Sequence, residues 1–267
     1  MQNYFTQFIK GIFSYKEAIV FLFNKKLIYF FIFPILFNFF LSSLVFYFLE
    51  MGSDYLHDHV LFLINGMLGT VVLNGGVISK VISISLWIFS KIFFLFLFLI
   101  FSGYITIIIL SPIFTFLSEK IAAIKTGHKY SFKLLQFFKD FFRAGVIAIR
   151  NIFIQFILML LFFLLGFVPI IGWAISIFGN AIVTSYFYGF SFMDFSNERN
   201  KRSIKESVNF IRKNGGIAVG IGLIFYFCLL IPLAGSFLAS LISIISLTAA
   251  TLSVEEININ STDLQSS

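Results

Sequence analysis

Two consecutive lysines, Lys25 and Lys26, are the residues of this sequence best suited to bind an anion. They stand directly before a long apolar run, where a helix is expected to begin. Cationic side chains and the unpaired backbone N–H groups of a helix start both attract an oxyanion. Lysines at the end of a membrane span also anchor it to lipid phosphates. On the residues alone, both interpretations stay open.

Other polar side chains occur within or beside apolar stretches. Glu119 follows one stretch, and a carboxylate at membrane depth is costly without a partner. It either pairs with a lysine such as Lys120, lines a vestibule or marks the membrane boundary. Asn38 and Thr251 lie inside apolar arms, where amides and hydroxyls bond helix to helix or line a pathway.

The sequence offers little for metal or covalent chemistry. Asp54, His57, Asp58 and His59 form the only cluster of metal-ligand type, and their spacing matches no established metal site. Cys228 is the single cysteine, which excludes an intramolecular disulfide and a cysteine-based metal site. No nucleophile elbow, zinc-binding helix motif or phosphate-binding glycine loop is present. We therefore predict no metal, no cofactor and no enzymatic activity.

The elements that must position these residues lie in lipid. Hydrophobic residues make up 59% of the 267 positions, 41 of them phenylalanine, whereas only 12% are charged. Residues 27–49 and 92–110 are apolar runs of membrane-spanning length, interrupted by only a few polar residues. Because lipid cannot hydrogen-bond an open backbone, the sequence predicts an all-α integral membrane protein.

The first half of the chain predicts two long transmembrane helices. Residues 1–20 alternate polar and apolar faces and predict an interfacial amphipathic helix. A first span is expected over 27–49, followed by an acidic loop over 50–60. The second long helix is expected over 81–116, which at 1.5 Å per residue overshoots the hydrocarbon core and must tilt or protrude.

The second half uses one unit twice. Each copy consists of a basic amphipathic helix, an apolar arm, a Pro-x-x-Gly turn and a return arm. The arms cover 152–168 and 173–192 in the first copy, and 217–231 and 236–252 in the second. The first arms are at or below the ~17 to 25 residues that a span needs, so each hairpin crosses fully or penetrates partway. The number of spans therefore stays open.

The formal charge of +7 is concentrated in three polar segments. All Lys and Arg residues except Lys80 and Lys91 fall within 1–26, 118–150 and 194–214. Basic segments near spans stay in the cytoplasm, which assigns all three to one side. We interpret the charge as orientation and contact with membrane lipids, not as nucleic-acid binding. Residues 1–254 are expected to form a single helical membrane domain, and the polar tail 255–267 to be disordered.

The order of several short motifs resembles the CysZ family of bacterial inner-membrane sulfate permeases, which shares its domain with eukaryotic etoposide-induced membrane proteins. The resemblance covers about residues 8–256. It is carried by Asn24-Lys25-Lys26 before Pro34 and Asn38, Ser111-Pro112-Ile113-Phe114 before Glu119 and Lys125-Thr126-Gly127, Val168-Pro169-Ile170-Ile171-Gly172, Asp194-Phe195, Ile231-Pro232-Leu233 and Ala249-Ala250-Thr251.

The resemblance implies a multi-pass protein of the bacterial cytoplasmic (inner) membrane that forms a homo-oligomer and admits sulfate for cysteine synthesis. It places the anion site at the start of the first long helix, hence at Asn24, Lys25 and Lys26. The family has arginines where this chain has Lys25 and Lys26, so the charge is retained but the bidentate fork is lost. A related oxyanion is therefore an alternative substrate.

A second hypothesis comes from composition alone. Three basic surface helices and shallow hairpins also suit a non-transporting protein that binds anionic lipid and organises or remodels the bilayer. Neutralising Lys129, Lys133 and Arg143 would test that role, and replacing Lys25 and Lys26 would test anion transport.

Overall fold

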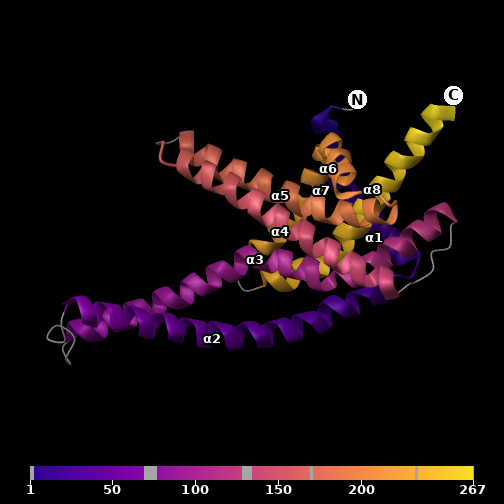
Figure 1. The fold of residues 1–267 in the computed structure, drawn as a ribbon. Coiled ribbons are helices and arrows are strands. Elements are labelled where there is room, and N and C mark those ends of the chain that lie inside the picture. Colours follow the sequence, from indigo (N-terminus) through magenta and orange to yellow (C-terminus); the bar gives the residue numbers. More distant parts are fainter. Residues whose placement is uncertain (1–2, 69–76, 128–133, 169–170, 232–233, 267) are drawn as a thin grey trace. The chain divides into compact units, whose positions relative to one another are not determined.

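The computed structural model describes residues 3–68, 77–127, 134–168, 171–231 and 234–266, and it confirms the predicted all-α fold (Figure 1). No strand occurs in these ranges. The helices are α1 (Tyr4–Asn24), the 3-10 helix η1 (Ile28–Phe31), α2 (Ile32–Leu68), α3 (Val77–Thr126), α4 (Leu134–Leu165), α5 (Ile171–Arg199), α6 (Ile204–Lys213), α7 (Gly215–Leu229) and α8 (Gly235–Ser266).

The chain divides into two compact units. One unit combines Met1–Ile35 with Gly103–Ser267, and the other is Leu36–Ser102. The boundaries fall inside α2 and α3, so each of these helices contributes to both units. We describe the units separately, and refer to the first as the main unit.

The smaller unit corrects the prediction of a loop over 50–60. That segment is part of α2, which is helical from Ile32 to Leu68. Glu50, Asp54 and Asp58 are four residues apart and so project from one side of the helix. Tyr55 and His59, also four residues apart, have their hydroxyl and Nε2 atoms 3.3 Å apart. An acidic, charge-bearing sequence is compatible with helix because it contains no proline.

In the main unit, α7 is the central helix. It packs against α5, α1 and α8, and most of its residues are buried. Close approach depends on glycine, since a Cβ on Gly222 would overlap the Ser185 carbonyl oxygen and one on Gly189 would overlap that of Ala218. The apolar second hairpin is therefore the core of the main unit.

Part of the polar stripe of α1 faces the protein. Gln7, Ser14 and Tyr15 are buried, whereas Phe5 and Phe13 are exposed. Gln7 donates to the carbonyl of Lys213 at 3.2 Å and accepts from the N–H of Gly216. The helix is present as predicted, but Gln7 and Ser14 are turned inward, where Gln7 bonds backbone groups of α6 and α7.

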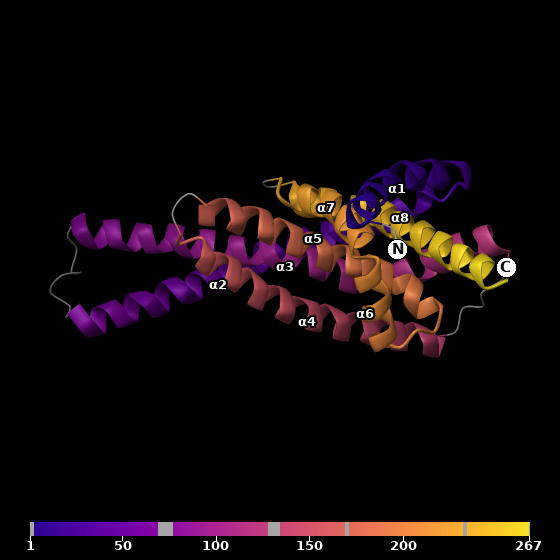
Figure 2. The same cartoon turned by 90° about the horizontal axis from the view of Figure 1, so that it is seen from above.

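The two hairpins differ in the structure although their sequences follow the same pattern. In the first copy the described part of the basic segment, from Leu134 on, and the apolar arm form one continuous helix, α4, which lies beside α5 (Figure 2). In the second copy α6 ends at Lys213 with Asn214 as its C-cap, and α7 begins separately at Gly215. The prolines of the two turns, Pro169 and Pro232, lie outside the described residues.

Both return helices extend past the predicted arms. α5 continues to Arg199 and α8 to Ser266. The segment 255–266, predicted to be a disordered tail, is therefore helical. Glu255 and Glu256 explain this in part, since they form ion pairs with Arg199 and with Lys10, respectively.

Within the described ranges, three segments are long and apolar enough to cross a membrane: Gly103–Thr126, Gly145–Leu165 and Phe237–Asn260. A fourth span is possible if α1 and Ile28–Phe40, which meet at a 109° bend, are counted together. The chain is thus a multi-pass membrane protein. The second long helix also runs through Pro112, where the Ser111 hydroxyl donates at 2.7 Å to the Ile108 carbonyl that a proline cannot bond.

Candidate functional site

The lysine pair lies in an exposed turn at the end of α1. The N–H of Leu27 bonds the Leu22 carbonyl at 2.9 Å, and the N–H of Lys26 bonds that of Phe23 at 3.1 Å. With Lys26 at φ 55°, these bonds form a Schellman motif, in which the left-handed position is usually glycine. Leu22 and Leu27 are both buried and complete its hydrophobic contact.

This geometry corrects one premise of the sequence argument. The N–H groups of Lys25, Lys26 and Leu27 all bond carbonyls of α1, so they are not free to bind an anion. The turn also stands at the negative end of the α1 dipole. Any attraction for an oxyanion here comes from the two lysine side chains, which are exposed together with Asn24.

A third lysine is held next to this turn. Lys120 of α3 donates to the Tyr29 hydroxyl at 2.6 Å, and its ammonium lies 5.2 Å from the centre of that ring. None of the ion pairs among the described residues involves Lys25, Lys26 or Lys120. The turn therefore brings a third positive charge near Lys25 and Lys26. Glu119 lies half-buried beside Lys120 on α3.

The remaining predicted polar positions are buried. Thr251 accepts from Ser196 at 3.2 Å and donates to Ser118 at 3.4 Å, so it joins α8 to α5 and α3. This bonding matches the helix-to-helix alternative for Thr251. Asn38 is buried within α2, in the smaller unit.

The structure does not assemble the cluster of metal-ligand type. Among the described residues, no group of three His, Cys, Asp or Glu side chains is arranged to hold a metal ion. Asp54, Asp58 and His59 lie along α2, and the side chain of His57 is outside the described set.

Three arginines of the main unit are engaged by acceptors. Arg143 of α4 contacts Asp194 at 3.0 Å and Glu198 at 3.6 Å, and it donates to the Arg202 carbonyl at 2.8 Å. The Asp194 carboxylate also accepts from the Ser207 hydroxyl. These contacts fix α4 and the start of α6 to α5.

Arg199 and Arg202 connect α5 to α8. Arg199, whose side chain is only 3% exposed, pairs with Glu255 and donates to the Ser118 carbonyl at 2.8 Å. Arg202 donates to Asn197 at 2.6 Å and to Asn258 at 2.9 Å. Burial lowers the pKa of the Arg202 guanidinium from its ordinary value. Arg143 and Arg199 thus form ion pairs, and Arg202 forms hydrogen bonds to two asparagines.

Helix α6 starts from a capping box beside this network. The Ser203 hydroxyl accepts from the Glu206 N–H, and the Glu206 carboxylate accepts from the Ser203 N–H at 2.8 Å. The hydrogen bonds from the Ser203 backbone and side chain lower the pKa of Glu206. The box sets where α6 begins, and therefore where Arg212 in its last turn is placed.

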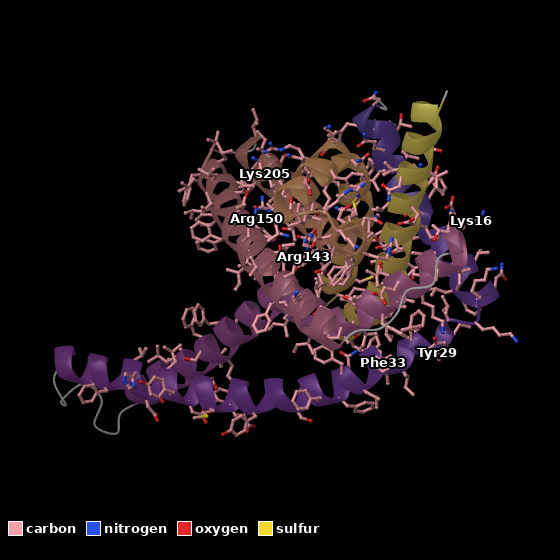
Figure 3. All side chains as sticks on the ribbon, turned by 45° about the vertical axis from the view of Figure 1, so that its right-hand side comes forward. Lys16, Tyr29, Phe33, Arg143, Arg150 and Lys205 are labelled. Carbon is pink, nitrogen blue, oxygen red and sulfur yellow. The ribbon has the colours of Figure 1, made fainter. Side chains whose placement is uncertain are left out.

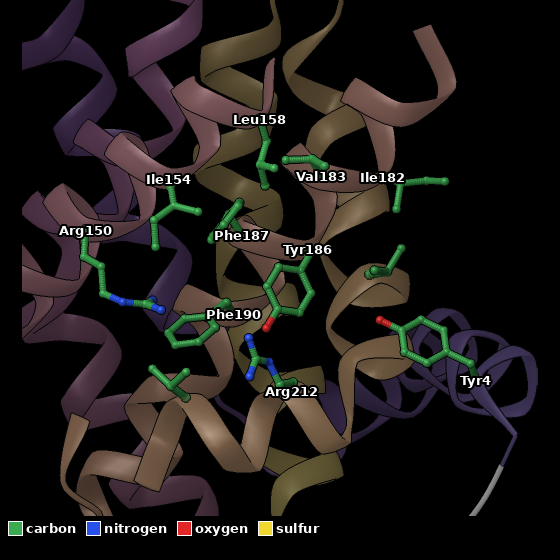
Figure 4. Close-up of a pocket in the computed structure, with 12 residues that line it drawn as sticks. Tyr4, Arg150, Ile154, Leu158, Ile182, Val183, Tyr186, Phe187, Phe190 and Arg212 are labelled. Atoms are coloured by element: carbon green, nitrogen blue, oxygen red, sulfur yellow. The ribbon is translucent and has the colours of Figure 1, made fainter. Parts of the chain in front are cut away.

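Two further arginines line a pocket, where Arg150 donates to the neighbouring Asn151 at 3.0 Å. Arg150 of α4 and Arg212 of α6 bound a cavity of about 470 Å³, with Tyr186 of α5 and Tyr4 of α1 (Figure 4). None of the ion pairs among the described residues includes Arg150 or Arg212. Figure 4 shows the Tyr186 hydroxyl beside the Arg212 guanidinium. We call this cavity the arginine pocket.

The arginine pocket is separate from the lysine turn. Figure 3 shows Arg150 and Arg143 well apart from Tyr29, which adjoins the turn. The sequence argument missed the pocket because it treated the basic segments as orientation signals. The available signal was residue type: Arg150 and Arg212 have the planar fork that Lys25 and Lys26 lack.

Fold and charge together define an all-α, multi-pass membrane protein with two exposed cationic sites in its main unit. The family comparison is more specific. The family model described as sulfate transporter CysZ/etoposide-induced protein 2.4 matches residues 14–240, and the chain belongs to this family. A search of curated proteins found no match to the chain.

Proposed function

We propose that this protein is a permease for sulfate, or a related oxyanion, in the bacterial cytoplasmic (inner) membrane, where it supplies sulfur for cysteine synthesis. The observation that carries the proposal is the family match over residues 14–240. A homo-oligomer is part of the proposal. The multi-pass helical fold supports transport, because only spanning elements can lead an ion through lipid.

We place anion capture at Asn24, Lys25 and Lys26. The support is the exposure of all three, the absence of ion pairs to either lysine among the described residues, and the third ammonium of Lys120 beside Tyr29. Three positive charges raise the local concentration of a divalent anion. Glu119, next to Lys120 on α3, is proposed as a polar position near this site, and Thr251 as a structural one that joins helices.

The left-handed conformation at Lys26 permits a test of this assignment. A side chain at φ 55° is less favourable than glycine, which is the usual residue of this motif. Glycine at this position would remove the ammonium and keep the motif, so the charge can be tested apart from the turn.

Equilibrium binding of radiolabelled sulfate to the purified protein tests the site. The informative variant is Lys25→Ala with Lys26→Gly, because glycine removes the ammonium and keeps the turn conformation. Lys16→Ala with Lys205→Ala is the matched control, since it removes the same charge from two other exposed lysines. We expect the first variant to lose sulfate binding and the control to retain it. Equal losses would show a response to net charge and would refute the site.

The lipid-organising alternative has one observation in its favour. The exposed side of α1 carries Phe5, Phe13 and Phe23, which suits a helix lying against the bilayer. The predicted basic stripe for this role is weakened, because Arg143 is engaged by Asp194 and Glu198. Lys129 and Lys133 lie outside the described residues. Liposome remodelling by protein that binds no sulfate would favour this function.

A further inference from the structure

The arginine pocket has a charged end and an apolar wall. Arg150 and Arg212 supply two guanidinium groups, and Tyr186 and Tyr4 supply two hydroxyls at the same end. Figure 4 shows the aliphatic side chains Ile154, Leu158, Ile182 and Val183 grouped above the two arginines. A ligand that fills the pocket must therefore be anionic at one end and apolar at the other.

The apolar wall follows the direction of a membrane span. Arg150, Ile154 and Leu158 are four residues apart and line one face of α4, within the candidate span Gly145–Leu165. From Arg150 to Leu158 the helix rises about 12 Å, against a half-thickness of about 15 Å for the hydrocarbon core. An acyl chain lying along this face would keep its headgroup at the level of Arg150.

The facing wall comes from α5 and is fixed in register. Gln155 donates to Thr184 at 3.1 Å, which sets α4 against α5 in the antiparallel hairpin. Tyr186 and Phe190 consequently lie toward the Arg150 end, and Ile182 toward the Leu158 end. The Arg150 guanidinium lies 5.6 Å from the centre of the Phe190 ring. This contact places the guanidinium at the polar end of the apolar wall.

The size and lining of the pocket do not suit a free oxyanion. Sulfate and phosphate need polar groups on all sides, because burying a charge against apolar surface is costly. Here the polar groups are confined to one end of a cavity of about 470 Å³. Guanidinium groups bind phosphate through bidentate hydrogen bonds, and the aliphatic wall matches a hydrocarbon tail.

We propose that the arginine pocket binds an anionic phospholipid, with its phosphate between Arg150 and Arg212 and an acyl chain against Ile154 and Leu158. The lipid bridges α4, α5 and α6, the three helices that supply most of the pocket. None of these residues belongs to the lysine turn, so the lipid site is independent of sulfate permeation.

Native mass spectrometry of the purified protein, titrated with dioleoyl phosphatidylglycerol, measures this binding. We expect Arg150→Gln with Arg212→Gln to weaken phosphatidylglycerol binding roughly ten- to thirtyfold. Two basic residues near a lipid phosphate together contribute an attraction of about this size. Phosphatidylcholine should bind more weakly than phosphatidylglycerol to the unaltered protein and respond little to the double variant. Thermal unfolding of each variant verifies that it is folded.

Two further variants identify the ligand. Val183→Trp keeps both arginines and fills the apolar end, so it should also weaken phosphatidylglycerol binding. Lys205→Gln with Lys213→Gln removes two exposed charges from α6 outside the pocket, and should bind phosphatidylglycerol like the unaltered protein. Inorganic phosphate and sulfate, added in excess, should not displace the lipid.

Each contrary result overturns the proposal. Unchanged binding by the double arginine variant would place the lipid elsewhere. An equal loss in the α6 lysine variant would reduce the effect to net charge. Displacement by inorganic phosphate, without an effect of Val183→Trp, would make the pocket a site for a small oxyanion.

Discussion

Five arginines of the main unit fall into two groups that differ in what surrounds them. Arg143, Arg199 and Arg202 are held by Asp194, Glu198, Glu255 and asparagine side chains. Arg150 and Arg212 line a pocket without a carboxylate. The same residue type therefore fixes helices in one place and offers charge to a ligand in another. The comparison teaches that the partner, and not the basic residue, decides the role.

The largest effect is expected at the most buried ion pair. Replacing Arg199 with methionine leaves the Glu255 carboxylate buried without its partner, which should lower the free energy of unfolding by about 3–5 kcal/mol. Thermal unfolding of purified protein measures the loss. The double variant with Glu255→Met should regain much of the stability, because no charge is left unpaired. If the single variant is as stable as the unaltered protein, the ion pair of Arg199 with Glu255 does not stabilise the fold.

A smaller loss is expected at the more exposed pair. Arg143→Ala removes charged hydrogen bonds to Asp194 and should lower the unfolding free energy by about 1.5–3 kcal/mol. Lys139→Ala, an exposed lysine on the same helix, is the control and should have little effect. Equal values for the two variants would mean that the contacts of Arg143 do not stabilise the fold.

The capping box of α6 is expected to contribute less again. Ser203→Ala should lower the unfolding free energy by about 1 kcal/mol, through loss of the N-cap bond. The pKa of Glu206 is lowered in the folded state, so the ionised carboxylate stabilises the fold. This stabilisation is present above the ordinary pKa of 4.5 and is lost as the pH falls through the folded pKa. Stability curves for the unaltered protein and Glu206→Gln should therefore differ at neutral pH and converge in acid. A constant difference would contradict this assignment.

The smallest effect on stability is expected in the unpaired group. Arg212→Gln breaks no ion pair among the described residues and should change the unfolding free energy by no more than about 0.5 kcal/mol. The measurement is the same thermal unfolding used for Arg199. A loss as large as that of Arg143→Ala would erase the distinction between the two groups.

Periodicity and hydrophobicity were sufficient to predict much of the fold. The all-α membrane class and the second long helix follow from apolar length, which depends only on local sequence. The loop over 50–60 was predicted wrongly, because Glu50, Asp54 and Asp58 were interpreted as a break although their spacing suits one face of a helix. The helical end of α8 was missed because its stabilising partners, Arg199 and Arg202, are more than fifty residues away.

The sites were less accessible to sequence reasoning. The lysine pair is a local feature that the sequence shows directly, but the bonding of its N–H groups back to α1 depends on the left-handed conformation of Lys26. The arginine pocket was not predicted, since Arg150 and Arg212 lie sixty-two positions apart and meet only through the packing of α4, α5 and α6. Arg143 and Arg150 both lie on α4 and look alike in the sequence. Only their tertiary contacts show that Arg143 is in an ion pair and that Arg150 lines the pocket.

Uptake of radiolabelled sulfate into proteoliposomes, compared with empty liposomes, tests the proposed function most directly. The protein should carry sulfate inward down its gradient, and the variant Lys25→Ala with Lys26→Gly should abolish that uptake while it stays folded. Folded, reconstituted protein that admits no more sulfate than empty liposomes would contradict sulfate permeation.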